Sequence, residues 1–77
     1  MTIDREWFKE QAKKSSGSVR ALAQELGKRQ KKVVDHATVV RMFAGKRAIL
    51  LEEAVLLADL FGVSLDEIAR RAGLKKR

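Results

Sequence analysis

The sequence predicts an all-α fold, a compact domain of five helices, from three observations. The 77 residues include no proline, and residue types that favour helix dominate, namely alanine, leucine, lysine, arginine and glutamate. Apolar residues recur at helical spacing in five segments, and serine, aspartate and glycine stand at many of the segment ends. A length of 77 residues suits one domain. Because the chain has no cysteine, it can form neither a disulfide nor a thiolate metal site.

The first two predicted helices span about 2–15 and 18–26. The first carries an apolar stripe at helical spacing, formed by Ile3, Trp7, Phe8 and Ala12. We expect the two aromatic residues of this stripe in the core. Ser18 is a favourable N-cap for the second helix. Gly27 stands where a helix-ending glycine is expected, so we expect the second helix to stop there.

The other three predicted helices span about 35–44, 51–61 and 64–72. Asp35 and Ser64 cap the first and the last of them, and a glycine ends each one: Gly45, Gly62 and Gly73. The buried face of helix 35–44 should hold three residues at helical spacing: Val39, Met42 and Phe43. Helix 51–61 is more apolar than a single stripe requires, so we expect it to be the central, most buried helix.

Composition argues against several classes of protein. No apolar run approaches the roughly 20 residues that cross a bilayer, and the N-terminal stretch lacks the apolar segment of a signal peptide. We therefore expect a cytoplasmic protein with no membrane partner. With one histidine, His36, no cysteine and no acidic loop of ligand spacing, we expect neither a metal nor a cofactor. No paired carboxylates, Ser-His-Asp set or phosphate-binding glycine loop is recognisable, so we expect no enzyme.

Nearly all of the excess positive charge is concentrated in one quarter of the chain. The formal net charge is +7, and +6 of it falls within residues 28–47. Seven basic side chains stand there against Asp35 alone: Lys28, Arg29, Lys31, Lys32, Arg41, Lys46 and Arg47. A basic zone between balanced segments is typical of a protein that binds a polyanion, although a solvated charge run gives the same count.

The segment DHATVVRMFAGKR, residues 35–47, carries the functional prediction. The outward face of its helix holds small groups and one long cation: His36, Ala37, Val40, Arg41 and Ala44. A short helix with such a face can enter the major groove, with Ala37 and Val40 on thymine methyls and Arg41 bidentate on guanine. His36 can reach a base edge or a phosphate, or it is an exposed histidine without a role.

An ordered set of residues resembles the phage-repressor/Cro-like (XRE-type) helix-turn-helix family. The set comprises Leu22-Ala23, Gly27, Val34-Asp35, Thr38-Val39, Arg41 and Gly45-Lys46-Arg47, and it continues through LEEAVLLADLFGVSLDEIAR. The resemblance implies a lambda-repressor-like helix-turn-helix domain, which we expect over 1–73, with a basic tail at 74–77. It implies a sequence-specific regulator of transcription that binds double-stranded DNA, acting as a repressor, with helix 35–44 in the major groove.

The resemblance also implies roles at matching positions. Three positions match residues that read bases: His36, Ala37 and Arg41. Thr38 matches a residue that touches a phosphate or supports one that does. Three residues after the recognition helix match a segment that lies against the DNA backbone: Gly45, Lys46 and Arg47. Phosphate contacts fix the position of a protein on the duplex, and base contacts determine which DNA sequence it prefers, so sequence-specific binding needs both kinds.

Two features depart from the family pattern. About six residues, 28–33, are inserted where the family has a turn of roughly 3–4 residues. Four of them are basic: Lys28, Arg29, Lys31 and Lys32. We expect either a mobile loop that binds DNA phosphates or a solvated loop without a role. Val19 stands where the family commonly has a phosphate-binding glutamine, and Arg20 can substitute for it.

Other partners and functions stay open at this stage. We expect a homodimer on a palindromic site, held by the first helix, the fifth helix or the tail, with apolar contact from Leu65, Ile68 and Leu74. The alternative function is the antitoxin of a toxin–antitoxin pair, since one fold serves several functions. A toxin or the transcription machinery is then a further partner, and structural binding to the nucleoid is a third option.

Overall fold

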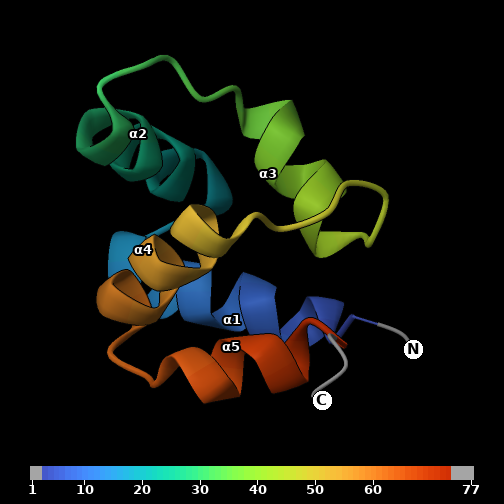
Figure 1. The fold of residues 1–77 in the computed structure, drawn as a ribbon. Helices are drawn as coiled ribbons and strands as arrows, with labels where there is room; N and C mark the ends of the chain where they lie inside the picture. Colours follow the sequence, from blue (N-terminus) through green and yellow to red (C-terminus); the bar gives the residue numbers. More distant parts are fainter. Residues whose placement is uncertain (1–2, 74–77) are drawn as a thin grey trace.

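The computed structural model describes residues 3–73, and within that range it contains five helices and no strand (Figure 1). The helices are α1 (Arg5–Ser16), α2 (Val19–Gln30), α3 (His36–Phe43), α4 (Leu51–Phe61) and α5 (Leu65–Arg71). The predicted all-α domain of five helices is confirmed. The predicted tail 74–77 lies outside the described residues, and Leu74 with it.

Helix α1 begins later than the predicted start near residue 2, because Asp4 is its cap. The Asp4 carboxylate accepts the backbone N–H of Trp7 at 3.2 Å. The backbone N–H of Asp4 donates to the carbonyl of Arg71 at 2.8 Å, and its carboxylate pairs with Nη1 of Arg71 at 2.9 Å. An aspartate that satisfies free N–H groups fixes where a helix starts, and here it also joins α1 to the end of α5.

The predicted end of α2 at Gly27 is wrong, because the helix continues through this glycine to Gln30. Gly27 is buried, and a Cβ built there would lie 2.6 Å from the carbonyl oxygen of Lys32. The glycine therefore serves a close approach of the chain rather than a helix end. The helix ends at Lys31 in the left-handed conformation, φ 56°, with the Lys32 N–H bonded to the Gly27 carbonyl at 3.0 Å.

The other predicted starts agree with the structure. The side chains of Ser18 and Ser64 accept backbone N–H groups three residues further on, at 3.0 and 3.1 Å. Asp35 accepts the N–H of Ala37 at 3.5 Å and begins α3 where expected. These caps depend on neighbours within one helical turn, which is why the sequence alone places them.

The core is built around α1, which contacts α2, α3 and α4. Phe8 is fully buried and stacks on Phe43 of α3, with ring centroids 5.0 Å apart. Trp7 is half-buried and meets the edge of Phe8, also at 5.0 Å. The predicted place of both α1 aromatics in the core is confirmed.

One prediction about apolar surface is wrong, and another needs a qualification of side. Helix α4 contacts α1, α2 and α5 and buries Ala54, Leu57 and Ala58, but Leu51 is 72% exposed and Val55 is 48% exposed, so only one side of this apolar helix faces the core. Ile68 was expected to supply a contact between subunits, yet it is fully buried in the core, so it cannot. Because apolar residues occur on more than one side of α4, the sequence does not determine which side of this helix packs against its neighbours. Leu65, by contrast, stays exposed.

Candidate nucleic-acid interface

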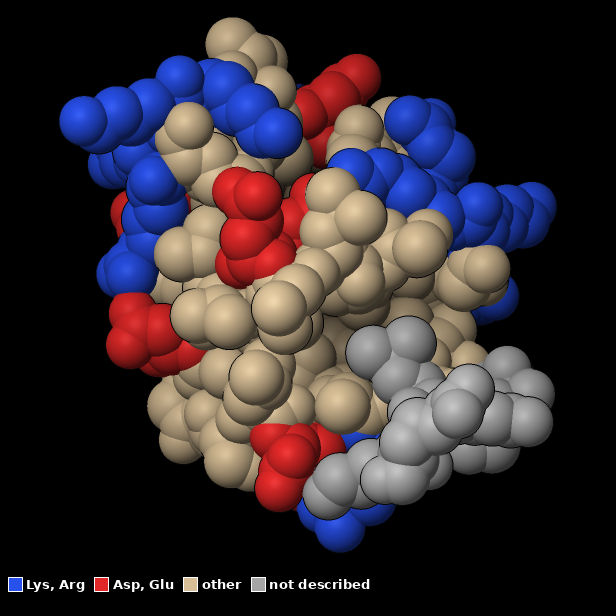
Figure 2. All heavy atoms as spheres, viewed as in Figure 1, with Lys and Arg blue, Asp and Glu red and all other residues tan. Residues whose placement is uncertain are grey.

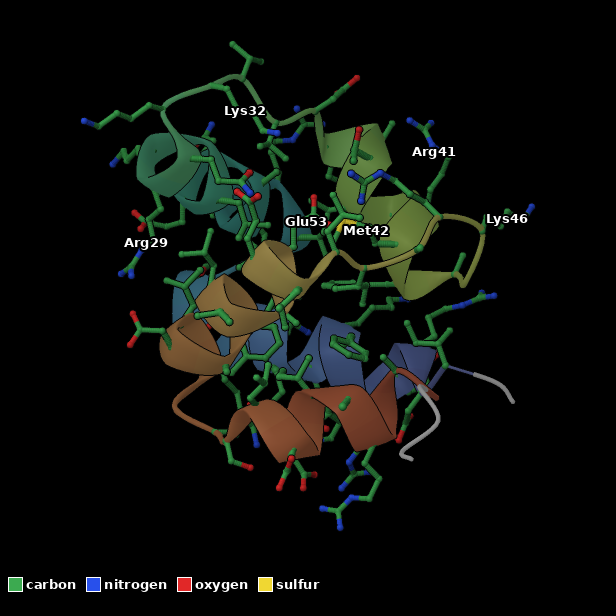
Figure 3. The ribbon with its side chains drawn as sticks, in the orientation of Figure 1. Arg29, Lys32, Arg41, Met42, Lys46 and Glu53 are labelled. Carbon is green, nitrogen blue, oxygen red and sulfur yellow. The ribbon has the colours of Figure 1, made fainter. Side chains whose placement is uncertain are left out.

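The outward face of α3 is the part of the molecule best shaped to enter a DNA groove. Three residues hold the helix in the core, each with 2% or less of its surface exposed: Val39, Met42 and Phe43. Val40, by contrast, is 45% exposed, and Arg41 points out of the fold while Met42 points into it (Figure 3). Half-buried positions on the same helix are His36, Ala37 and Thr38, and the C-cap residue Ala44 is half-buried as well. The predicted buried face of this helix is confirmed.

The loop between α3 and α4 carries two cations with different surroundings. Lys46 is exposed and lies at the outer edge of the molecule, beyond the end of α3 (Figure 3). Arg47 instead forms a bidentate pair with Glu53, with both Nη–Oε distances at 3.0 Å. Its Nη1 also donates to the Ala48 carbonyl at 3.2 Å. Of the two cations in the segment that the resemblance places against the DNA backbone, Arg47 is paired with Glu53, whereas Lys46 forms no ion pair within the described residues.

Glu53 is the buried charge that organises this loop, and the sequence analysis did not single it out. Only 6% of it is exposed, and its Oε1 accepts the backbone N–H of Leu50 at 2.9 Å. Burial of the Glu53 carboxyl raises its pKa. The hydrogen bonds from Arg47 and Leu50, together with the charge of Arg47, lower the pKa by more than burial raises it, so the pKa of Glu53 lies below its ordinary value. The same hydrogen bond raises the pKa of Arg47. Both groups are thus charged at neutral pH.

The basic segment between α2 and α3 is only partly a loop. Lys28 and Arg29 belong to the last turn of α2, so the expected six-residue loop is shorter than predicted. Arg29 points away from Arg41 and Lys46, and its Nη1 pairs with Asp59 of α4 at 2.6 Å (Figure 3). Lys31 and Lys32, by contrast, are exposed residues of the connection that leads into α3. The structure therefore does not bring all four cations to one face.

A groove joins the outward face of α3 to its neighbours. It has a volume of about 290 Å³ and is lined by residues of α1, α2, α3 and the cap of α3: Arg5, Lys9, Val19, His36, Val40, Phe43 and Ala44. Arg20 lies exposed beside Val19 in the first turn of α2, and Thr38 is half-buried on α3. The start of α2 and the outward face of α3 thus border one groove, whose other wall is α1.

The charge on the visible face is uneven. Lysine and arginine side chains gather over the connection from α2 to α3 and over α3 with the loop that follows it (Figure 2). Between and below these two groups the surface is mostly uncharged, with isolated acidic side chains. Within residues 3–73, no group of three or more histidine, cysteine, aspartate or glutamate side chains is placed to hold a metal ion. No described helix is both long and apolar enough to cross a membrane.

Comparison with known families agrees with this geometry. The helix-turn-helix family HTH_3 matches residues 8–68, so the chain belongs to this family of XRE/Cro-type domains. Members of this family bind DNA and are not enzymes, so the protein belongs to the class of DNA-binding helix-turn-helix proteins. The match begins within α1 and ends within α5, so it covers α2, α3 and α4 completely and the first and last helices in part. No curated protein and no solved structure is significantly similar to the chain.

Proposed function

We propose that this protein is a sequence-specific regulator of transcription that inserts α3 into the major groove of double-stranded DNA. The observation that carries the proposal is the exposed pair Val40 and Arg41 on a helix whose opposite face is locked in the core. An arginine can bind guanine through two hydrogen bonds, and Val40 with Ala37 offers apolar contact to thymine methyl groups. His36, at the first turn of the same helix, borders the groove and is the fourth candidate base-reading residue.

Phosphate contacts complete the proposed interface. Lys46 after α3, Lys31 and Lys32 before it, and Arg20 at the start of α2 are exposed cations near the ends of the helix pair. Thr38 stays a candidate on α3 itself. We give Arg47 and Arg29 supporting roles instead, because Glu53 and Asp59 already occupy their guanidinium groups. Lys28 pairs with Glu25 at 3.7 Å, but its side chain is 76% exposed, so it stays a candidate phosphate contact.

We further propose that two copies bind together and repress transcription by covering a promoter. One recognition helix reads only a short half-site, and two copies related by a two-fold axis read half-sites roughly 34–36 Å apart. Exposed apolar side chains at the start of α4 support a contact between copies there: Leu50, Leu51 and Val55. Helix α4 follows directly on the loop that carries Lys46, so a contact at its start joins the two copies near the end of each recognition helix.

Selection of binding sites from random duplex DNA tests the function directly. We expect an enriched motif with two inverted half-sites, and a reporter gene behind that motif should be expressed less when the protein is present. Binding should also weaken steeply with salt, by a slope of about −0.9 in log K against log salt for each neutralised phosphate. No enrichment, together with an affinity indifferent to salt, would overturn the proposal.

A further inference from the structure

Three cations of α1 line one side of that helix, and nothing described so far uses them. Arg5, Lys9 and Lys13 stand four residues apart, so they lie on one face of the helix as a basic stripe. All three are exposed. Over residues 1–27 the sequence is nearly balanced in charge, and for that reason the distribution of charge along the chain does not point to these three residues.

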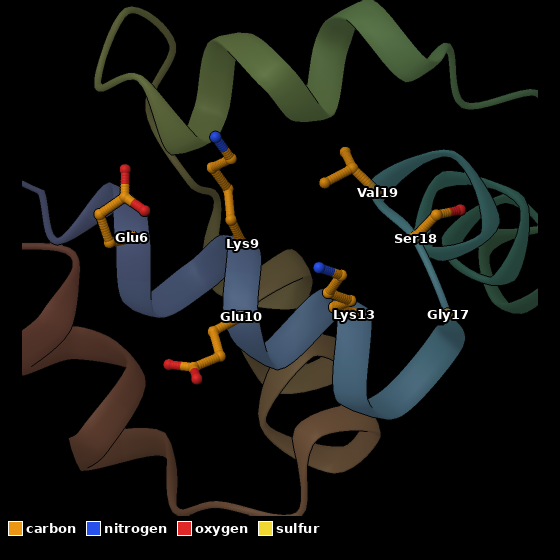
Figure 4. Close-up of a pocket in the computed structure, with 7 residues that line it drawn as sticks. All are labelled: Glu6, Lys9, Glu10, Lys13, Gly17, Ser18 and Val19. Carbon is orange, nitrogen blue, oxygen red and sulfur yellow. The ribbon is translucent and has the colours of Figure 1, made fainter.

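The basic stripe borders both elements that face the DNA in the proposed function. Arg5 and Lys9 line the groove of about 290 Å³ together with His36 and Val40 of α3. Lys9 and Lys13 line a second, wider hollow of about 640 Å³, which reaches Ser18 and Val19 at the start of α2. In Figure 4, Lys9 and Lys13 point toward α3 and the start of α2. One stripe thus runs alongside α3 and the start of α2.

The stripe is also free to take a new partner. Within residues 3–73, none of its three side chains forms an ion pair, whereas Arg29, Arg47 and Arg71 are all paired. Glu6 and Glu10 of α1 line the wider hollow too; Glu10 points away from α3, whereas Glu6 lies on the same side of α1 as Lys9, so one carboxylate stands beside the three cations (Figure 4). On the wall formed by the start of α2, Val19 has no side-chain donor and Ser18 offers one uncharged hydroxyl, whose oxygen already accepts the Ala21 N–H. The cations of α1 are therefore the strongest anion ligands around these hollows.

We propose that the basic stripe of α1 binds backbone phosphates of the DNA strand that borders the groove occupied by α3. The inference rests on the proposed function, because it needs α3 seated in the major groove. A cation that meets phosphates adds affinity that depends on salt and carries no sequence preference. The interface then consists of α3, the exposed cations before and after it in the chain, Arg20 at the start of α2, and the basic stripe of α1, a helix for which the sequence indicates core packing or a contact between copies but no DNA contact.

The test compares two lysines of the same helix. Lys9→Gln removes a charge from the stripe, and Lys14→Gln removes an equal charge about 140° further around α1, where it lines neither hollow. Affinity for a selected site and for a random duplex is measured over a range of salt concentrations. We expect Lys9→Gln to flatten the salt slope by about 0.9, and Lys9→Gln with Lys13→Gln by about twice as much. Lys14→Gln should change it by far less.

Two further measurements make the outcome decisive. Thermal unfolding shows that the variants are folded, and Lys9→Arg, which keeps the charge, should restore the slope. Ethylation of single phosphates should block the wild type at a position where it no longer affects Lys9→Gln. If wild type binds DNA with a steep slope but Lys9→Gln and Lys14→Gln behave alike, the role of α1 is wrong and the proposed function stands. If wild type binds no duplex, both are wrong.

Discussion

Arg47 and Glu53 form a bidentate ion pair that closes the loop between α3 and α4, with two N–O distances of 3.0 Å. The pair ties a loop residue to the first turn of α4, where Glu53 also accepts the Leu50 N–H. Lys46, one residue earlier, is left pointing outward beyond the end of α3 (Figure 3). The half-buried Arg47 is thus fixed by Glu53, while its neighbour Lys46 stays exposed, where a DNA backbone can reach it.

Removing the Glu53 carboxylate should destabilise the domain. Glu53→Ala leaves Arg47 without its partner and the Leu50 N–H without an acceptor, and we expect a loss of about 2–3 kcal/mol in the free energy of unfolding. Urea denaturation measures it. Glu52→Ala is the matched control, because the neighbouring carboxylate is exposed and has only a 3.4 Å contact with Gln30. Equal losses for both variants would contradict a special role for Glu53.

The same pair should make stability depend on pH in a defined window. The pKa of Glu53 is lowered in the folded state, so its contribution is complete above the unfolded-state pKa of about 4.3 and is lost as pH falls through the folded value. The difference in melting temperature between wild type and Glu53→Gln should therefore be largest near neutral pH and shrink below about pH 4. Glu67, whose pKa is also lowered, is present in both proteins and cancels. A difference that stays constant with pH would contradict this.

Gly27→Ala should destabilise the domain although alanine favours helix. The added Cβ would lie 2.6 Å from the Lys32 carbonyl oxygen, a backbone atom that cannot move without displacing the connection to α3. We expect a loss of about 1–3 kcal/mol, typical of overpacking. Gln24→Ala, on the exposed side of α2, is the control and should change stability by less than about 0.5 kcal/mol. An unchanged melting temperature for Gly27→Ala would contradict this prediction, because it would mean that the connection between α2 and α3 can shift at little cost in free energy.

Arg41→Ala should weaken binding to the selected site by about 1–3 kcal/mol and relax preference at one base pair. The reason is the place of Arg41 on the exposed side of α3, opposite a face fixed by Met42. Competition between the selected site and its single-base variants measures the effect. Arg20→Ala is the comparison, since a phosphate contact should weaken all sequences alike. If Arg41→Ala also weakens all sequences alike, Arg41 binds the backbone instead.

Leu51→Glu should abolish the proposed dimer without unfolding the domain. The Leu51 side chain is mostly exposed, so a carboxylate there costs the monomer little but places like charges together in a two-fold contact. Sedimentation of the free protein and of its DNA complex measures the number of copies. Leu65→Glu is the parallel variant at the exposed position on α5. A dimer that survives Leu51→Glu but not Leu65→Glu would move the contact to α5.

Expectations that depend on near neighbours in the chain agree with the structure. The caps at Ser18, Asp35 and Ser64 act within a single turn, and the buried face of α3 follows from helical periodicity. The concentration of charge in residues 28–47 and the ordered family pattern are likewise properties of the chain itself. Together they predicted the helices, their order and the DNA-binding class.

Expectations that needed distant neighbours did not follow from the sequence. Gly27 reads as the end of a helix, and only the approach of Lys32 explains why a glycine stands inside one. The sequence likewise groups Arg29 and Arg47 with the other cations, although Asp59 and Glu53 hold them in the fold. The reason is physical: helical period and capping energy are encoded within a few residues, whereas a cation's partner and a helix's exposed side depend on which segments the folded chain brings into contact.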